Sequence, residues 1–166
     1  MQPDVTEEER PGLRLLEPPT ASTPSAARGR RWHPSSKTRG DGPLLYICGE
    51  PEGRIIFIRI ARRWESMRLV VADGWQLGLQ LAARRRPRMV VLDASLPGVD
   101  GADFVTHLRQ RVLPAQTPII VLGDDHTPSE RARFVWAGAS AYHAKPLNVA
   151  EVDGSVATLL EITALG

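Results

Sequence analysis

Long apolar runs and cysteines are what this sequence has least of. No uninterrupted apolar stretch approaches the roughly 18 residues that a membrane-spanning helix needs, so we predict no membrane span. Cys48 is the only cysteine of the 166 residues, which excludes an intramolecular disulfide and a zinc site built from cysteines. The N-terminus is acidic and lacks the apolar segment of a secretory signal. Together these absences predict a cytoplasmic protein.

Lysine is also scarce, since only Lys37 and Lys145 occur and arginine carries most of the positive charge. The net charge is +2, which gives little support to binding of nucleic acid by the chain as a whole. No glycine-rich phosphate loop of the dinucleotide-binding or Walker type follows the first predicted strand. A nucleotide-binding function therefore has no support in the sequence.

Composition divides the chain into residues 1–42, interpreted as a disordered Pro/Arg-rich tail or linker, and residues 43–166, interpreted as one folded domain. Half of the 14 prolines lie at or before Pro43, and no helical or strand period there is long enough to bury a face. The one apolar cluster of the tail is Leu13, Leu15 and Leu16. We interpret it as part of a solvated tail, with docking on another surface as the alternative.

From residue 44 onward, short apolar runs alternate with longer amphipathic stretches. Strands are predicted at 44–47, 68–72, 89–92, 118–122 and 139–144, and helices at 55–67, 75–86, 100–112, 127–137 and 149–162. The helix start at Thr127 is the clearest, because a threonine cap is followed by proline and, three residues on, by Glu130. Five alternations predict an α/β fold of three layers, with a parallel sheet between helices.

The stretch from Met89 to Gly101 carries the strongest functional signal in the sequence. Four apolar residues end at a single carboxylate, Asp93, and turn-forming residues such as Pro97 and Gly98 follow. In parallel α/β sheets, functional groups lie just past the carboxyl ends of the strands. Asp93 is therefore predicted to stand at the mouth of a crevice.

This string resembles the phospho-acceptor segment of response-regulator receiver domains, in which an aspartate ends the third strand and a Pro-Gly-x-Asp-Gly loop follows. The resemblance covers about residues 44–161. It implies a flavodoxin-like (βα)5 sheet with strand order 2-1-3-4-5, and makes residues 43–166 a receiver domain in phosphorelay signalling rather than an enzyme. It further implies that Asp93 accepts a phosphoryl group from a histidine kinase or phosphotransfer protein.

Two more residues match the family pattern. Lys145 directly precedes Pro146 and matches the lysine that contacts the phosphoryl oxygens, and Tyr142 matches the aromatic residue that changes rotamer on phosphorylation. Because no further domain follows Gly166, we predict no DNA-binding domain. The output is then expected to reach a downstream protein partner through the face that includes the fifth strand and the last helix.

Three positions depart from the pattern. Cys48 and Gly49 stand where receivers carry two adjacent acids that bind Mg²⁺, and neither is a suitable ligand for a hard ion. With Asp93 retained as a ligand, Glu50 and Asp124 are the candidate substitutes for the lost acids. Gly123 stands where receivers carry a Ser or Thr that hydrogen-bonds the phosphoryl group.

Two main hypotheses follow. The retained Asp93 and Lys145 favour a phospho-accepting receiver, with Mg²⁺ as its cofactor. Gly49 and Gly123 favour the alternative, a phosphorylation-independent pseudo-receiver that acts as a protein–protein interaction module. A third hypothesis, a redox or catalytic protein built on Cys48, has little support because no histidine has a motif relationship to this thiol.

Overall fold

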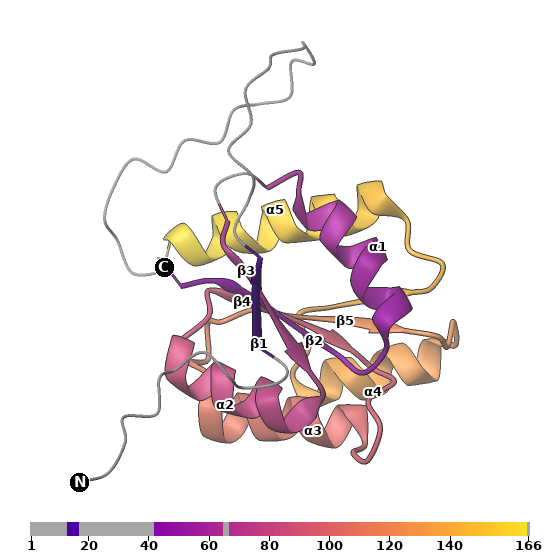
Figure 1. Ribbon diagram of the computed structural model, residues 1–166. Helices are drawn as coiled ribbons and strands as arrows, with labels where there is room; N and C mark the ends of the chain where they lie inside the picture. The colour runs from indigo at the N-terminus through magenta and orange to yellow at the C-terminus, as the bar shows by residue number, and fades with distance from the viewer. Residues whose placement is uncertain (1–12, 17–41, 65–66, 166) are drawn as a thin grey trace, which may run out of the picture.

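The structure is a computed structural model that describes residues 13–16, 42–64 and 67–165 (Figure 1). Its strands are β1 (Leu13–Leu16), β2 (Leu44–Cys48), β3 (Leu69–Asp73), β4 (Met89–Asp93), β5 (Ile119–Gly123) and β6 (Ala141–Ala144). Its helices are α1 (Pro51–Ala61), α2 (Trp75–Arg85), α3 (Gly101–His107), α4 (Pro128–Ala137) and α5 (Val149–Leu165), and α3 runs directly into a π-helical turn, η1 (Leu108–Val112). No helix in these ranges is long and apolar enough to cross a membrane.

All strands belong to one sheet, in the order β1-β3-β2-β4-β5-β6. The pairs β2–β3, β2–β4, β4–β5 and β5–β6 are parallel, so the order 2-1-3-4-5 predicted for the five parallel strands is confirmed. The register sets Leu92 beside Ile47 on one side and Val121 on the other. The carboxyl ends of β2, β4, β5 and β6 therefore meet at one edge of the sheet.

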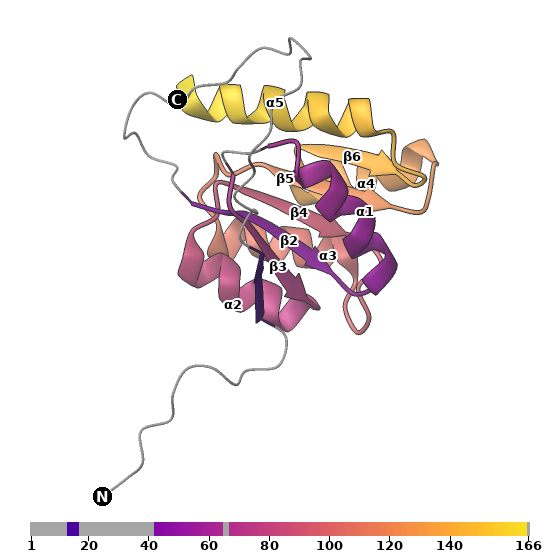
Figure 2. The same ribbon diagram turned by 45° about the horizontal axis from the view of Figure 1, so that its top comes forward.

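The central strands are buried on both faces, as their nearly continuous apolar sequences predict. Figures 1 and 2 show α1 and α5 on one face, and α2, α3 and α4 on the other. Alternate residues of each strand serve the two layers. On β2, Tyr46 belongs to the core layer that includes Phe57 of α1 and Val152 of α5. Ile47 belongs to the opposite layer, with Leu81 and Phe104. Asp93 thus ends a strand that is fixed by packing from both sides.

The segment β1 corrects the prediction for the tail. Residues 13–16 pair antiparallel with β3, from Leu13 opposite Ala72 to Leu16 opposite Leu69, so this segment is a strand at the edge of the sheet. The expectation of a solvated tail is wrong here, because the edge of β3 offers free backbone donors and acceptors that an apolar segment can pair with. The remainder of the predicted tail, 1–12 and 17–41, lies outside the described residues.

Helix boundaries differ from the prediction mainly in α1. The apolar period predicted a start at Ile55, but the helix begins at Pro51, where a missing N–H is tolerated in the first turn. The third helix covers the predicted range, with Asp100 as its cap: the carboxylate accepts from the N–H groups of Ala102 and Asp103, at 3.0 Å each. Its last turn is π-helical, and the Leu113 N–H donates to the Leu108 carbonyl at 2.8 Å.

Candidate functional site

Asp93 and Lys145 meet at the carboxyl edge of the sheet. Asp93 is only 1% exposed although it is a carboxylate. The Lys145 ammonium, just past β6, donates to both carboxyl oxygens of Asp93 at 3.0 Å. The N–H of Ser95 donates to the same carboxylate at 3.1 Å. These partners are what a buried charge requires, since an unpaired one costs several kcal/mol.

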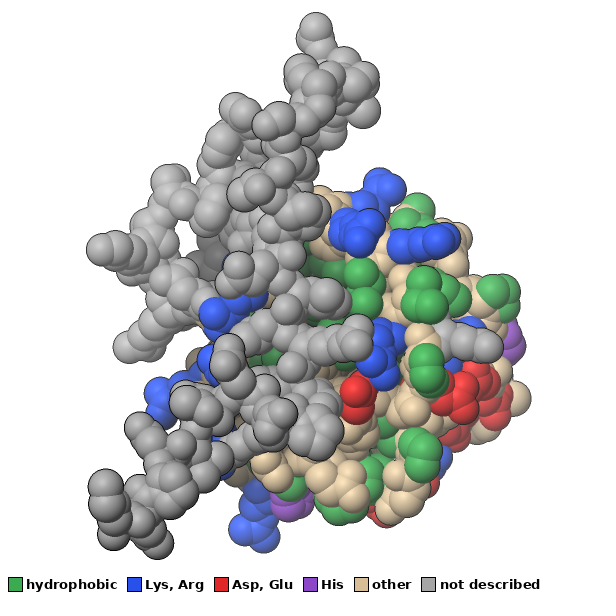
Figure 3. All heavy atoms as spheres, in the orientation of Figure 1, with side chains coloured by type: hydrophobic (Ala, Val, Ile, Leu, Met, Phe, Trp, Pro, Cys, Tyr) green, Lys and Arg blue, Asp and Glu red, His purple; other side chains and the backbone are tan. Residues whose placement is uncertain are grey.

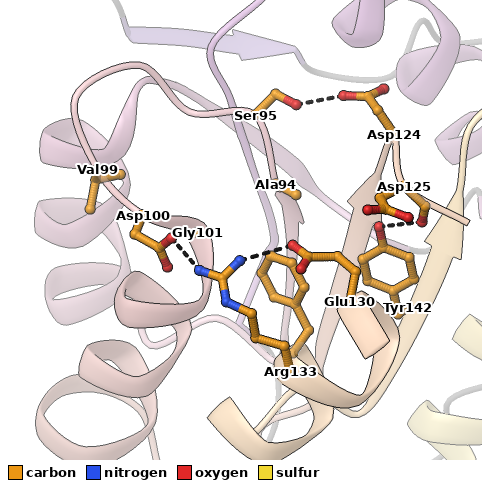
Figure 4. A pocket seen from close by; sticks show the side chains of 11 residues that line it. Ala94, Ser95, Val99, Asp100, Gly101, Asp124, Asp125, Glu130, Arg133 and Tyr142 are labelled. Atoms are coloured by element: carbon orange, nitrogen blue, oxygen red, sulfur yellow. Dashed lines mark hydrogen bonds and ion pairs between the residues drawn. The ribbon is translucent and has the colours of Figure 1, made fainter. Parts of the chain in front are cut away.

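Lys145 is shared between two carboxylates, because its ammonium also lies 3.3 Å from Oδ1 of Asp124. Burial opposes the charged ammonium, yet the hydrogen bond and the charge of Asp93, followed by those of Asp124, raise the pKa of Lys145 above its ordinary value. The Ser95 hydroxyl donates to Asp124 at 2.5 Å and is the main cause of a lowered pKa of Asp124 (Figure 4). The predicted Asp124 therefore lies at the site, but as a partner of Ser95 and Lys145.

Tyr142 fills the space that a side chain at Gly123 would need. A Cβ atom built on Gly123 would lie 2.0 Å from the Tyr142 hydroxyl, so neither Ser nor Thr fits there while the ring stays in place. The hydroxyl donates to the Asp125 carbonyl at 2.8 Å, and the ring packs 5.4 Å from that of Phe134. Burial raises the pKa of Tyr142. The loss of the hydroxyl expected at Gly123 is thus coupled to an inward position of Tyr142.

The edge next to Asp93 offers no room for a second carboxylate. A Cβ atom on Gly49 would lie 2.5 Å from Cδ of Pro97, which excludes a side chain unless Pro97 moves. Cys48 is buried, and burial raises the pKa of its thiol. Glu50 is exposed at the start of α1, and no described contact joins it to Asp93. The structure does not bring the predicted substitute Glu50 into the site.

These residues do not fit Mg²⁺, the cofactor that the resemblance implies. The ion prefers several oxygen ligands in octahedral geometry. Among the described residues, no group of three or more His, Cys, Asp or Glu side chains could hold a metal ion. The lysine occupies both oxygens of Asp93, and the predicted substitute Asp124 is bound to Ser95 and the same lysine.

Two residues, one on α1 and one on β2, were missed by the sequence interpretation. Arg54 of α1 forms an ion pair of 2.5 Å with Asp73 at the end of β3. Tyr46 of β2 is 0% exposed, and its hydroxyl has no hydrogen-bond partner in the described part of the chain. A Cβ atom on Gly53 would lie 3.1 Å from Oδ2 of Asp93 and 3.3 Å from the Tyr46 hydroxyl, so both groups face the same small space. A tyrosine inside an otherwise aliphatic strand is the one sequence signal that points there.

A hollow of about 260 Å³ opens beside the loop that follows Asp93 (Figure 4). Four of its lining residues are acidic, namely Asp100, Asp124, Asp125 and Glu130. Arg133 of α4 ion-pairs with Asp100 and, at 2.9 Å, with Glu130, and so joins α4 to the start of α3. Figure 3 shows acidic side chains gathered on this side of the molecule, at the right.

Comparisons with known proteins agree on one family. The family model for the response regulator receiver domain matches residues 50–157. The KDP operon transcriptional regulatory protein KdpE of Escherichia coli K12 is 35% identical over 104 residues, which are 63% of this chain and 45% of that protein. The phosphate regulon transcriptional regulatory protein PhoB of Rhizobium meliloti is 31% identical over 121 residues, 71% of this chain and 52% of that protein.

Solved structures give the same fold. The signal receiver domain of a DNA binding response regulator protein (merR) from Colwellia psychrerythraea superimposes with a TM-score of 0.67 at 21% identity, over 72% of this chain and 98% of that one. At this identity the likeness concerns the fold alone. The chain spans about half the length of the curated relatives it matches, 45% and 52% in the two cases above.

Proposed function

We propose that this chain, which belongs to the response-regulator receiver domain family, accepts a phosphoryl group on Asp93 and passes the signal to a protein partner. The observation that carries the proposal is the Lys145 ammonium, 3.0 Å from both oxygens of a buried carboxylate at the carboxyl edge of the sheet. In this proposal the chain acts in the cytoplasm as a signalling protein, with a histidine kinase or a phosphotransfer protein as its donor.

The reaction is a transfer between two partners. A carboxylate oxygen of Asp93 attacks the phosphorus atom, a new O–P bond forms, and the bond from phosphorus to the leaving nitrogen or oxygen breaks with its electron pair going to the donor. Negative charge accumulates on the transferring oxygens. In this proposal Lys145 compensates it, and the contact of its ammonium with both carboxyl oxygens supports that role.

The output face in this proposal lies on α4, β6 and α5. A groove of about 630 Å³ runs between these elements, and the side chains of Val135, Tyr142 and Leu159 are among those that line it. Trp136 of α4 is 89% exposed, and its neighbour Val135 is 52% exposed. Tyr142 lines both this groove and the hollow beside the loop that follows Asp93, which supports the proposal that it connects the site with the face.

The pseudo-receiver hypothesis is the second candidate, and it has its own observation. Gly49 and Gly123 lack side chains that the family chemistry uses, and Pro97 and Tyr142 fill the two spaces. In that case the same face on α4, β6 and α5 binds its partner without phosphate.

The test is the mass of the intact protein after incubation with acetyl phosphate, in parallel with Mg²⁺ and with EDTA. We expect an adduct of one phosphoryl group in the wild type and in Asp103→Asn, which removes an exposed carboxylate of α3, and none in Asp93→Asn. Absence of an adduct in both conditions, with native circular dichroism, would overturn the proposal and leave the pseudo-receiver.

A further inference from the structure

The amino edge of the sheet, opposite the Asp93 site, carries exposed arginines. In a parallel sheet each helix returns the chain to the edge where the next strand begins, so the ends of the helices gather there. Five exposed arginines at this edge form no ion pair within the part of the chain that is described. They form the amino-edge patch: Arg68 before β3, Arg84, Arg85 and Arg86 at the end of α2, and Arg111 of η1.

Backbone contacts join these segments around the start of β2. The Leu44 N–H donates to the Arg68 carbonyl at 2.9 Å. A Cβ atom on Gly42 would collide with the Arg86 carbonyl oxygen, so the two backbones touch. The turn η1, which carries Arg111, packs against α2. The patch is therefore assembled by the fold from segments that are far apart in the sequence.

The sequence that leads into Gly42 adds more positive charge. From Arg28 to Arg39 it contains five cations and no acid, and Arg39 precedes Gly42 by three positions. Because Gly42 lies against Arg86, this basic stretch joins the fold at the patch. Acidic side chains gather at the opposite edge, at the right in Figure 3. The small net charge of the chain thus hides a separation of charge between the two edges of the sheet.

The backbone of Arg86 is in a conformation that arginine rarely adopts. Its φ of 45° and ψ of 64° are left-handed, at the position after a helix where glycine is preferred. No other residue except glycine has a positive φ in the described ranges. A residue with a Cβ atom is strained there, and such strain is typical of functional positions. The position therefore favours a role for the guanidinium itself.

The side chains of this edge fit phosphate groups. A guanidinium binds a phosphate through two parallel hydrogen bonds, and a nucleic acid offers phosphates in a regular line. Proteins that lie on membranes usually add an apolar face to their cations. The large apolar side chains exposed in the described part of the chain belong to α1, α4 and α5, and none belongs to α2, η1 or the segment before β3. The chemistry of this edge therefore favours nucleic acid over a lipid surface.

We propose that the amino-edge patch binds the phosphate backbone of a nucleic acid, independently of base sequence. The patch and Asp93 lie at opposite edges of the sheet, so a nucleic acid on the patch leaves the Asp93 site open. The inference does not depend on phosphorylation of Asp93. Each guanidinium that binds a phosphate releases a counterion, and the affinity should fall steeply as the salt concentration rises.

The experiment measures fluorescence anisotropy of a labelled DNA duplex of about 20 base pairs with the full chain, from about 25 to about 200 mM NaCl. We expect a micromolar Kd at low salt and a slope of log K against log [NaCl] of about −4, since each phosphate contact contributes roughly −0.9. For Arg84→Gln/Arg85→Gln we expect at least about tenfold weaker binding at low salt and a slope shallower by about 2.

The matched control removes two exposed arginines that lie outside the patch, in Arg59→Gln/Arg131→Gln. Its affinity should stay within about twofold of the wild type, because neither arginine belongs to the amino edge. Native circular dichroism of both double variants shows that a loss of affinity is not a loss of fold.

The substitution Arg86→Gly separates binding from folding. Glycine relieves the left-handed strain, so the midpoint of thermal unfolding should rise by roughly 2–4 °C. The affinity for the duplex should fall by about three- to tenfold, because one phosphate contact is lost. An unchanged affinity in this more stable variant contradicts the proposal.

Other results would also overturn it. They are absence of DNA binding at low salt, an affinity that does not depend on salt, and equal losses in the two double variants. Vesicles of phosphatidylcholine and phosphatidylserine test the alternative source of phosphate. Tighter binding to these vesicles than to the duplex would assign the patch to a membrane surface and refute the assignment to nucleic acid.

Discussion

The substitution Tyr46→Phe tests whether the buried Tyr46 hydroxyl lacks a hydrogen-bond partner in the folded protein. The Tyr46 ring is fully buried, with its centroid 4.3 Å from that of Phe57, and its hydroxyl has no partner in the part of the chain that is described. Removal of the oxygen leaves the ring packing in place and eliminates a buried, unpaired polar atom. We therefore expect the variant to be more stable than the wild type.

The magnitude follows from the desolvation of the hydroxyl. Leaving a buried donor unpaired costs about 1–3 kcal/mol, and the phenylalanine ring fills nearly the same volume. We expect a gain of about 1 kcal/mol in the free energy of unfolding, at the lower end of that range because the ring has to settle into the space left by the oxygen. For a chain of this size, the gain raises the midpoint of thermal unfolding by roughly 2–4 °C.

The assay is urea-induced unfolding followed by circular dichroism, with Tyr142→Phe as the matched control. The Tyr142 hydroxyl donates to the Asp125 carbonyl at 2.8 Å, so its removal should lower the free energy of unfolding by about 0.5–1.5 kcal/mol. The two variants are thus expected to shift stability in opposite directions. A loss of stability in Tyr46→Phe would refute the reasoning, because it would mean that this hydroxyl is paired in the folded protein.

Three other predictions concern the surroundings of the site. Gly123→Ser should displace the Tyr142 ring, since a Cβ atom at position 123 would lie 2.0 Å from the Tyr142 hydroxyl. Nitration of Tyr142 by tetranitromethane should then become faster, while the buried Tyr46 stays unreactive. Arg109→Met should lower the free energy of unfolding, measured in urea, by about 2–4 kcal/mol. The Arg109 guanidinium donates to the carbonyls of Gly138 and Thr117 at 2.9 and 2.8 Å, and these hydrogen bonds tie η1 to the end of α4 and the start of β5. The N–H of Asp103 and the Arg133 side chain lower the pKa of Asp100, so its contribution to stability is complete above its ordinary pKa of 3.8 and is lost as the pH falls below it. Urea titrations at acid pH should therefore show a shallower loss of stability in Asp100→Asn.

The strands and their order were predictable because each is a short apolar run that ends in turn-forming residues. Strands of this kind, buried on both faces of a parallel sheet, can be ordered in few ways if every crossover connection is right-handed. The strand β1 was not predictable in this way, since its three leucines marked only an apolar cluster and a run of four residues does not show what it pairs with. Its pairing with the edge of β3 is a tertiary contact, and tertiary contacts override weak local preference.

Most predicted residues that the structure brings to the site stand at strand ends, and Tyr142 within β6 is the exception. Asp93 ends β4 and Lys145 follows β6, so the strand order alone brings them to one edge. Glu50 was a candidate because it is close to Cys48 in the sequence, yet it lies exposed at the start of α1. The ion pair of Arg54 with Asp73 was not predicted, because it depends on where a long helical side chain reaches, which spacing along the chain does not show.

At Gly49 and at Gly123, another residue fills the space that the expected side chain would need, so neither position is an empty remnant of the family site. Pro97 occupies the space that an acid at Gly49 would take, and the Tyr142 hydroxyl occupies that of a side chain at Gly123. Restoring one acid by Gly49→Asp would therefore collide with Pro97. Recovery of an acid at this position then requires that Pro97 changes as well. Gly49→Asp alone is therefore expected to leave Mg²⁺ binding unchanged in a calorimetric titration, whereas Gly49→Asp combined with Pro97→Ala removes the obstacle.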